Sequence, residues 1–441
     1  MKKNMYVFWG LVITTLISAL DSNIMQTASP TIVKQFGGME YFAWIFSVYM
    51  LASTVTVPLY GKLSDMYGRK ILLVVSVVIF TIGSILCGMA NSMVTLIIYR
   101  GIQGLGAGGM VPLAIIIVGD LFTIEKRGKI QAIFSAIWAL SSIIGPVLGS
   151  FFVEELTWRW IFFINIPIGI LTILCLIPYK EQREFKKTNI DYKGFFLFGI
   201  SITLLMLATN VRNPFWYVVF GVIGMIIFIL VERKEKEPFL PVTLLKNKGI
   251  LTSNVFMMFY TLSFFSTSSF IPLYLQEGKD VSIYMSGLIL LSISIAWMFG
   301  SPPAGKWIIK YGYRRLFIIG SFLTTISGLA LYLFIQDIGY WVLFLILGIQ
   351  GFAFGLLFAT GTIASQEFAG FHIKGLSTSL QMFLKNIGNS VGVTIMGVII
   401  SKAVTINMGM KNVFLFALLT SLITIIVSFF IPRETGEVTE G

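Results

Sequence analysis

The stretch GKLSDMYGRK at residues 61–70 has a partner in GKWIIKYGYR at residues 305–314, shifted by 244 residues. The two stretches share Gly-Lys and Tyr-Gly at the same offsets. A second pair, GIQGLGAG at 101–108 and GIQGFAFG at 348–355, is shifted by 247 residues. Two matches at nearly the same shift indicate that the chain contains two copies of one unit.

The composition is that of a protein built for a lipid bilayer. Of 441 residues, 56% are hydrophobic and only 12% are charged, and the mean hydropathy is +0.88. Apolar segments of about 20 residues, the length that crosses a bilayer as a helix, recur with short polar breaks. We expect an all-α integral membrane protein with fourteen spans. The spans are 6–27, 42–60, 71–89, 93–117, 130–153, 160–178, 194–210, 215–231, 250–275, 283–303, 314–335, 339–363, 376–400 and 413–431.

The repeats predict the domain organisation. Spans one to six and nine to fourteen are the two copies, and spans seven and eight are an inserted hairpin without a repeat partner. Both copies start on the same side, so they are parallel repeats, and the substrate site is expected at their interface near the midplane. The expected domains are 1–180, a linker with the inserted helices at 181–249, a second repeat at 250–432 and a tail at 433–441.

The distribution of Lys and Arg predicts the orientation, because cytoplasmic loops are enriched in these residues. With the N-terminus inside, 24 of the 32 basic residues fall in cytoplasmic segments and 6 in the opposite loops. Both termini are therefore expected in the cytoplasm, in a bacterial cell membrane. The net charge of +12 needs no nucleic acid, since the basic residues are dispersed over loops and not interleaved with stacking aromatics.

Asp21 is the residue that points most directly to a mechanism. It lies fifteen residues into the first expected span, where a carboxylate is costly unless it faces a polar cavity. At 1.5 Å per residue it lies about 22 Å from the cytoplasmic side of a ~30 Å core, and Arg100 lies about 10 Å from the outside. We expect Arg100 to be close enough to control proton binding by Asp21. The alternative is a structural carboxylate that caps a broken helix.

The motif at residues 61–70 resembles the signature of the major facilitator superfamily in nearly every defined position, and the resemblance covers essentially the whole chain. Within that family the chain is similar to the fourteen-helix drug:proton antiporters, on the residues LD at 20–21, RGIQGLGA at 100–107, GPVLG at 145–149 and WRWIFFINIP at 158–167. It departs from the pattern at Ser150, where a second glycine is usual. It also has no acidic residue within the spans of the second repeat.

The resemblance implies a major facilitator fold and a set of gating residues. Asp65 would contact the N-terminal end of a helix in the other half, and Arg69 would pair with Asp120, which together would hold the cytoplasmic side closed. Gly61 and Gly68 make the tight turn possible. The gating positions in the fifth span, where a proline and two glycines permit a bend or a close helix contact, are Gly145, Pro146 and Gly149.

The energy source is expected to be a proton gradient, and no cofactor is expected. The chain has no G-x-x-x-x-G-K-[ST] loop for ATP. It has no metal cluster and no catalytic constellation, so an enzyme is not expected. The expected partners are a small amphipathic molecule, protons and membrane lipids, with no nucleic acid, and the protein is expected to be a monomer.

The favoured function is proton-coupled export of amphipathic compounds, hydrophobic or cationic, by alternating access. The candidate substrate-binding residues are Gln26, Tyr49, Gln103, Trp138 and Lys385. Lys385 has three open explanations: it snorkels to the interface, pairs with a polar group or repels cationic substrates. Two other functions stay open, a narrow exporter or flippase of a lipid-linked or metabolite substrate and a non-transporting receptor or channel.

Overall fold

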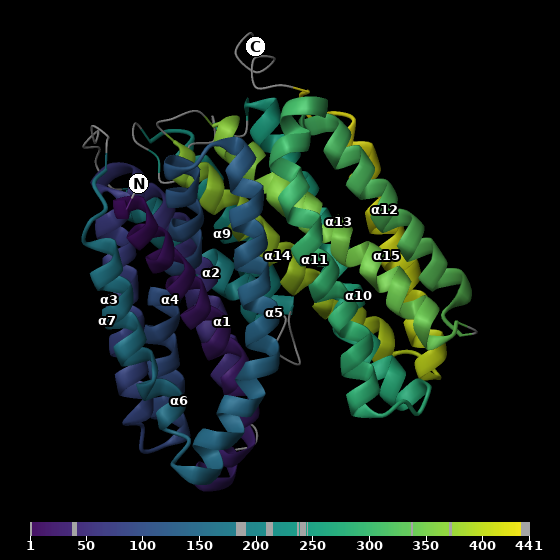
Figure 1. The fold of residues 1–441 in the computed structure, drawn as a ribbon, viewed down its shortest axis with the longest axis horizontal. Helices are drawn as coiled ribbons and strands as arrows, with labels where there is room; N and C mark the ends of the chain where they lie inside the picture. Colours follow the sequence, from purple (N-terminus) through teal and green to yellow (C-terminus); the bar gives the residue numbers. More distant parts are fainter. Residues whose placement is uncertain are drawn as a thin grey trace. The chain divides into compact units, whose positions relative to one another are not determined.

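A computed structural model describes residues 2–37, 42–181, 191–208, 215–235, 238, 244, 246–336, 338–369 and 373–433. Every regular element among them is helical, as expected from the sequence (Figure 1). The elements of the first half are α1 (Lys2–Phe36), α2 (Phe42–Tyr67), α3 (Arg69–Gly88), α4 (Met93–Leu121), α5 (Ile124–Glu155), α6 (Trp160–Phe163), α7 (Asn165–Leu176), α8 (Tyr192–Leu207) and α9 (Phe215–Glu232). The second half contains α10 (Lys248–Leu273), a π-helical turn η3 (Tyr274–Gly278), α11 (Ile283–Tyr311), α12 (Tyr313–Phe334), α13 (Tyr340–Glu367), α14 (Lys374–Ser401) and α15 (Ile406–Ser428).

Each expected span falls on helical structure, and the described part contains 12 helices long and apolar enough to cross a membrane. Two shorter apolar segments, Trp160–Leu176 and Tyr192–Leu207, occupy the positions of the expected sixth and seventh spans.

Several expected boundaries were wrong, because helices continue beyond the apolar stretch where polar residues reach water. α2 extends to Tyr67 and α11 to Tyr311, well past the expected ends at 60 and 303. The expected span 160–178 is divided between α6 and α7. Pro167 lacks the N–H that would donate to the carbonyl oxygen of Phe163, which accounts for the break there.

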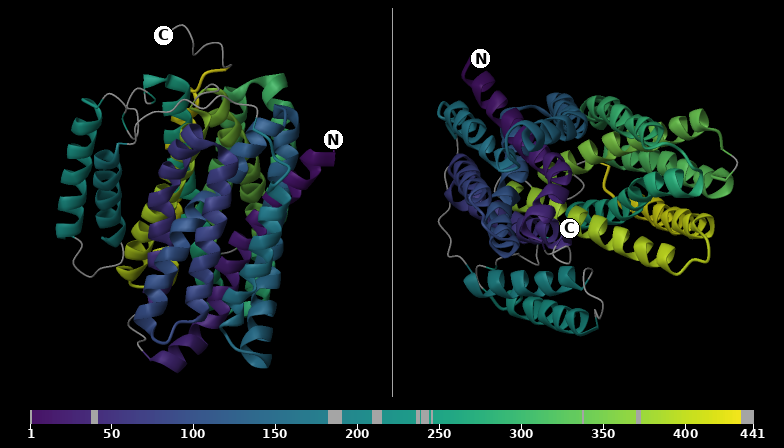
Figure 2. Two further views of the ribbon diagram at one scale, coloured as in Figure 1. Left: turned by 90° about the vertical axis from the view of Figure 1, so that its left-hand side faces the viewer. Right: turned by 90° about the horizontal axis from the view of Figure 1, so that it is seen from below.

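The chain divides into two compact units. The first contains α1 to α4, the part of α5 from Ile137 onward, and α6 to α9. In it α4 packs against α1, α2 and α3, while α7 packs against α1 and α3. Figure 2 shows α8 and α9 side by side as a pair at the edge of this unit, and α8 also contacts α2. α4 is therefore the helix around which the first unit is built.

The second unit contains α10 to α15 together with Phe122–Ala136 at the start of α5. Here α13 packs against α10, α11, α12 and α14, the central role that α4 has in the first unit. The core is apolar and strongly aromatic, with Phe256, Tyr260, Phe317 and Phe354 all fully buried.

The repeat inferred from the sequence has a counterpart in the backbone. Gly68 separates α2 from α3 with φ of 102°, and Gly312 separates α11 from α12 with φ of 76°. Both values lie in the region that residues with a Cβ rarely adopt. The same glycine of the two related stretches thus makes the same sharp turn in each unit.

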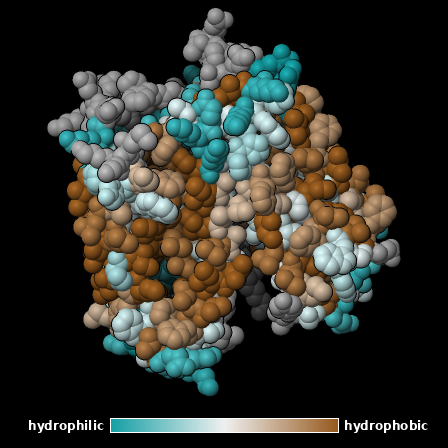
Figure 3. All heavy atoms as spheres, in the orientation of Figure 1, coloured by the Kyte–Doolittle hydropathy of each residue, from teal (hydrophilic) through white to brown (hydrophobic). Residues whose placement is uncertain are grey.

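The helix surfaces fit a lipid environment. On the face shown in Figure 3, apolar residues cover the middle of the helices in each unit and hydrophilic residues gather toward the helix ends. Large apolar side chains such as Ile82, Phe196, Ile326 and Leu345 are exposed. Because contiguous apolar surface of this extent is unfavourable in water, the chain is a multi-pass membrane protein.

Candidate functional site

A buried ion pair lies inside the first unit. Arg100 of α4 donates from Nη1 to Oδ2 of Asp21 of α1 at 2.9 Å. The two side chains are only 1% and 2% exposed. The proximity expected from their similar depth is thus confirmed, and the carboxylate is enclosed by protein rather than by lipid.

Two amides complete the environment of Asp21. Gln103, one turn after Arg100, donates from Nε2 to Oδ1 of Asp21 at 2.8 Å, and Asn165 at the start of α7 donates to the same oxygen at 3.4 Å. Both amides also donate to Oγ of Ser84 on α3, at 2.7 and 3.1 Å. We call Asp21, Ser84, Arg100, Gln103 and Asn165 the polar network. It joins four helices of the unit around one negative charge.

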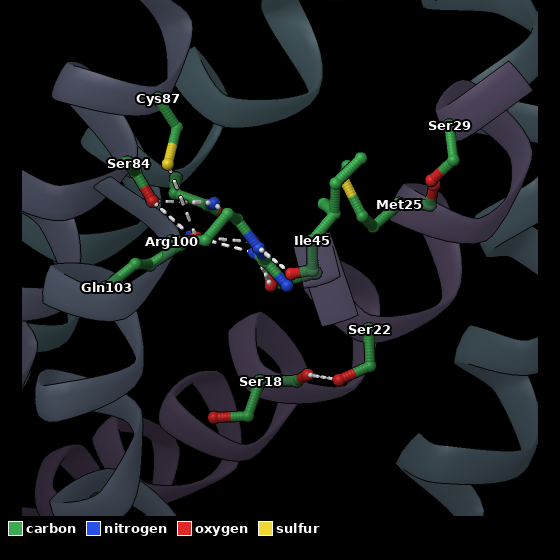
Figure 4. A network of polar contacts seen from close by, with 11 residues as sticks. Ser18, Ser22, Met25, Ser29, Ile45, Ser84, Cys87, Arg100 and Gln103 are labelled. Atoms are coloured by element: carbon green, nitrogen blue, oxygen red, sulfur yellow. Dashed lines mark hydrogen bonds and ion pairs between the residues drawn. The ribbon is translucent and has the colours of Figure 1, made fainter. Parts of the chain in front are cut away.

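Arg100 has further partners besides the carboxylate. Its Nη1 donates to Oε1 of Gln103 at 2.5 Å, and its Nε donates to the carbonyl oxygen of Ile45 at 3.4 Å. Its guanidinium carbon lies 4.1 Å from the centre of the Tyr49 ring, a cation–π contact. Figure 4 shows Arg100 and Gln103 pointing from α4 toward Ser84, Cys87 and Ile45.

Glycine brings the helices of the network together. A Cβ at Gly104 would lie 2.5 Å from the carbonyl oxygen of Tyr49, and one at Gly83 would lie 2.5 Å from the backbone of Gln103. Both distances are too short for real atoms. The small residues of 101–108 thus set the close approach of α2 and α3 to α4, on which the contacts of Arg100 and Gln103 depend.

Asp21 and Arg100 each have partners besides one another. The charged form of Asp21 accepts three hydrogen bonds, two of them from neutral amides that would also tolerate a protonated acid. If Asp21 takes up a proton, Arg100 keeps Gln103, Ile45 and Tyr49 as partners.

A second charged cluster lies at the turn between α2 and α3. Arg69 is buried and forms ion pairs with Asp120, at the end of α4, and with Asp65 at 3.4 Å. The pair of Arg69 and Asp120 that the resemblance implied is present. Lys70 donates from Nζ to the carbonyl oxygens of Ile177 and Tyr179, which ties the turn to the end of α7. The expected contact of Asp65 with the other half stays a prediction.

Burial, with a smaller contribution from the charge of Glu181, raises the pKa of Tyr179 to about 12. Its hydroxyl therefore stays neutral beside this turn at any pH at which transport would be measured.

A related cluster in the second unit was missed by the sequence reasoning. Arg127, near the start of α5, donates from Nη1 to Oε1 of Glu367 at 2.6 Å, and Nζ of Lys374 lies 3.8 Å from the same oxygen. Glu367 is the last residue of α13 and Asp120 is the next-to-last residue of α4. The two positions differ by the repeat shift of 247. Applying that shift to Asp120 was the signal that could have found it.

The sequence also did not predict Asn165 and Ser84 as site residues, although Asn165 lies within a stretch quoted for the resemblance. Neutral polar residues are frequent in membrane helices, and no spacing rule predicts that α3 and α7 meet at Asp21. Only the packing of the helices shows it.

The other predicted site residues have less specific surroundings. α5 continues through residues 145–149, and a Cβ at Gly145 would lie 2.6 Å from that of Asn23, so the glycine permits close contact of α5 with α1. The side chains of Pro146 and Gln26 lie outside the described residues. Trp138 is half-buried on α5. Tyr49 and Gln103 contact the polar network, and as substrate-binding residues they stay predictions.

The chain is similar in sequence to known membrane transporters. The family model described as the Major Facilitator Superfamily matches residues 11–393 and 255–440. The multidrug transporter protein MdtP of Bacillus subtilis is 35% identical over 409 residues, which cover 90% of this chain and 76% of that protein. Multidrug resistance protein 3 of the same organism is 36% identical over 405 residues, covering 89% and 79%.

The fold is also that of a solved transporter. The crystal structure of the human organic anion transporter MFSD10 has a TM-score of 0.72 and covers 97% of this chain and 99% of its own, at 14% identity. At that identity the likeness concerns the fold alone.

Proposed function

We propose that this chain, which belongs to the major facilitator superfamily, is a proton-coupled exporter of amphipathic, hydrophobic compounds. It is an efflux transporter by family, not an enzyme, and the coupling ion and substrate are the proposed part. The observation that carries the proposal is a fully buried acid held by an arginine and two amides inside a helical membrane unit. The names of the two bacterial relatives favour broad over narrow specificity.

In the proposed cycle Asp21 takes up a proton from outside and releases it to the cytoplasm, while substrate moves the other way. When Arg100 and Gln103 lie against Asp21, as they do here, they favour the charged form. When they move away, the acid protonates. The proton gradient then drives a change between two arrangements of the halves, which is the alternating access expected of this family.

The turn between α2 and α3 is the proposed gate. Arg69, Asp120 and Asp65 would stabilise one state through their ion pairs, and Gly68 would allow the turn that places them. The expectation that Gly61 also makes this turn was wrong, because Gly61 lies within α2, six residues before its end at Tyr67. Gly145, with Pro146 and Gly149, would allow α5 and α1 to slide at close contact. We place this turn and both termini on the cytoplasmic side of a cell membrane, on the distribution of basic residues.

We further propose that α8 and α9 are an inserted transmembrane hairpin and that the protein has fourteen spans. α9 is 18 residues long and apolar, and α8 packs against both α9 and α2. Nζ of Lys62 donates to the carbonyl oxygen of Pro238 at 2.8 Å, so the segment after α9 contacts the last turns of α2.

The test of function uses the purified full-length protein in proteoliposomes with an imposed pH gradient and a fluorescent hydrophobic substrate. The wild type should move substrate against its gradient only while the pH gradient is present. Asp21→Asn should reduce transport to the level of empty vesicles, because the proton-binding group is lost. Glu155→Gln removes an exposed carboxylate at the end of α5 and should leave transport unchanged. Proton-coupled efflux by Asp21→Asn equal to that of the wild type would overturn the proposal.

A further inference from the structure

The second unit contains a cation, Lys385, in the middle of a helix, and no described carboxylate of this unit pairs with it. Lys385 is the twelfth residue of α14, about 16 Å from its start, beyond the reach of its four-carbon stem. The described carboxylate side chains of this unit, Glu125, Asp280 and Glu367, lie near helix ends, and none forms an ion pair with Lys385. Snorkelling and pairing with an acid therefore do not explain this residue.

The ammonium group of Lys385 is placed against an aromatic wall. Its Nζ lies 4.7 Å from the centre of the Phe358 ring on α13. That ring stacks on Phe354 at 5.7 Å, and Phe354 stacks in turn on Phe264 of α10 at 4.1 Å. The cation therefore lies at one end of a row of parallel rings.

Two side chains on the helices around Phe358 carry hydrogen-bonding atoms that have no partner among the described residues. Gln381, one turn earlier on α14, is fully buried, and neither its Nε2 nor its Oε1 is hydrogen-bonded within the described part of the chain. It faces α13, since a Cβ at Gly361 would lie 3.2 Å from its Nε2. Nε1 of Trp297 on α11 is also buried without a partner, although the indole ring packs edge-on against Phe354 and Phe358 at 4.7 and 6.2 Å.

Buried polar groups in proteins are almost always hydrogen-bonded, and those that are not call for a ligand or water. Among the described residues, the unmatched groups on the helices around Phe358 are a positive charge, an amide that offers both an N–H and a C=O, and an indole N–H. An anion is the ligand that matches the three donors, and flat rings adjoin them.

We propose that Trp297, Phe358, Gln381 and Lys385 form a binding site for an aromatic amphiphile that carries a negative charge, such as an aryl carboxylate or sulfonate. This rests on the proposed function, since the ligand would be an exported substrate. Its acidic group would lie at Nζ of Lys385 and accept from Gln381 and Trp297, while its rings pack against Phe358 at the end of the row next to Lys385. A cationic amphiphile of the same shape is disfavoured because Lys385 repels it, which narrows the substrate range expected from the sequence.

The probes are 1-anilinonaphthalene-8-sulfonate and N-phenyl-1-naphthylamine, which have the same rings and differ by the sulfonate. Ethidium serves as a cationic probe. Binding is measured as ligand-induced thermal stabilisation of the purified full-length protein without any gradient. The wild type should bind the sulfonate more tightly than the neutral amine and ethidium most weakly.

Lys385→Gln should weaken sulfonate binding by about tenfold, while binding of the neutral amine changes less than about twofold. Lys385→Arg keeps the charge and should keep most of the affinity. The matched control is Lys411→Gln, because Lys411 also lies over a ring, that of Tyr332 at 5.6 Å, but is exposed near the start of α15. It should behave as the wild type.

If Lys385→Gln does not fold, Trp297→Phe supplies an independent test, since it keeps the ring and removes only the N–H donor. It should weaken sulfonate binding about threefold and leave the neutral amine unaffected. Equal affinities of wild type, Lys385→Gln and Trp297→Phe for the sulfonate would overturn the inference. Binding as expected without transport under a pH gradient would overturn the proposed proton coupling and leave this site standing.

Discussion

The two units hold different interiors at positions that the repeat relates. In the first unit, Arg100 and Gln103 of α4 are fully engaged with Asp21 and its neighbours. Their counterparts in α13, 247 residues later, are Leu347, which is fully buried, and Gln350, whose Oε1 has no hydrogen-bond partner among the described residues. The second unit instead has stacked aromatic rings further along α13, at Phe354 and Phe358.

The framework, in contrast, is shared. Gly104 and its counterpart Gly351 both let a neighbouring backbone approach, since a Cβ at either would collide with a carbonyl oxygen, that of Tyr49 or Ile293. Gly68 and Gly312 make equivalent turns. Small residues thus fix how the helices pack in both units, and the larger side chains decide what chemistry each interior supports: by our proposals, proton binding in one and binding of an aromatic anion in the other.

The largest loss of stability should follow from replacing Arg100 by leucine, the residue found at the equivalent position 347 of the second unit. Arg100→Leu leaves the carboxylate of Asp21 buried without a cation, which should cost about 3–5 kcal/mol of stability. Thermal unfolding of the purified protein measures it. Asp21→Asn combined with Arg100→Leu should recover much of the loss, because no charge is then stranded. The control Leu347→Met conserves volume and should cost less than about 1.5 kcal/mol. A loss for Arg100→Leu no greater than that control would contradict the role of the ion pair.

The equivalent glutamines Gln103 and Gln350 provide a second test of the difference between the two interiors. Gln103→Leu removes hydrogen bonds to Asp21 and Ser84 and should cost about 1–3 kcal/mol, whereas Gln350→Leu should be near neutral because its Oε1 is unmatched. Denaturation of both variants side by side gives the difference. Equal losses would mean that the second interior is as highly ordered by hydrogen bonds as the first.

Substitutions in the two charged clusters at the helix ends should change the stability by more similar amounts than the substitutions in the two interiors. Arg69 is 3% exposed in its pair with Asp120, and Arg127 is 10% exposed in its pair with Glu367, where Lys374 also contributes. We expect Arg69→Ala to cost about 2 kcal/mol and Arg127→Ala about 1 kcal/mol, between the values for buried and surface pairs. Thermal unfolding at low and high salt checks both, and the reverse order would be evidence against this assignment of burial.

The smallest effect should come from glycines whose surroundings differ. No atom lies within 4 Å of a Cβ added at Gly348, so Gly348→Ala should raise stability by up to about 1 kcal/mol, because alanine favours the helix. Gly351→Ala, three residues later, should instead be destabilising by overpacking against Ile293. The melting temperatures of the two variants should move in opposite directions, and a common direction would refute the packing argument.

The sequence by itself determined the class of protein, the related stretches of its two halves, the approximate positions of the helices and the presence of a carboxylate, Asp21, inside the first of them. These follow from local properties: apolar run length, a repeated turn glycine and the high cost of a carboxylate in lipid. It also placed Arg100 at the right depth, because helical rise converts residue number into distance along the membrane normal.

Only the tertiary structure decided which side chains complete each interior. Asn165 and Ser84 reach Asp21 because α7 and α3 pack at α4, and Glu367 meets Arg127 although 240 residues separate them. The missing partners of Gln381 and Trp297 likewise appear only when the surroundings of each atom are known. Rotation of a helix about its axis and the choice of its neighbours depend on packing with distant segments, and the hydropathy of a lipid-facing helix does not encode them.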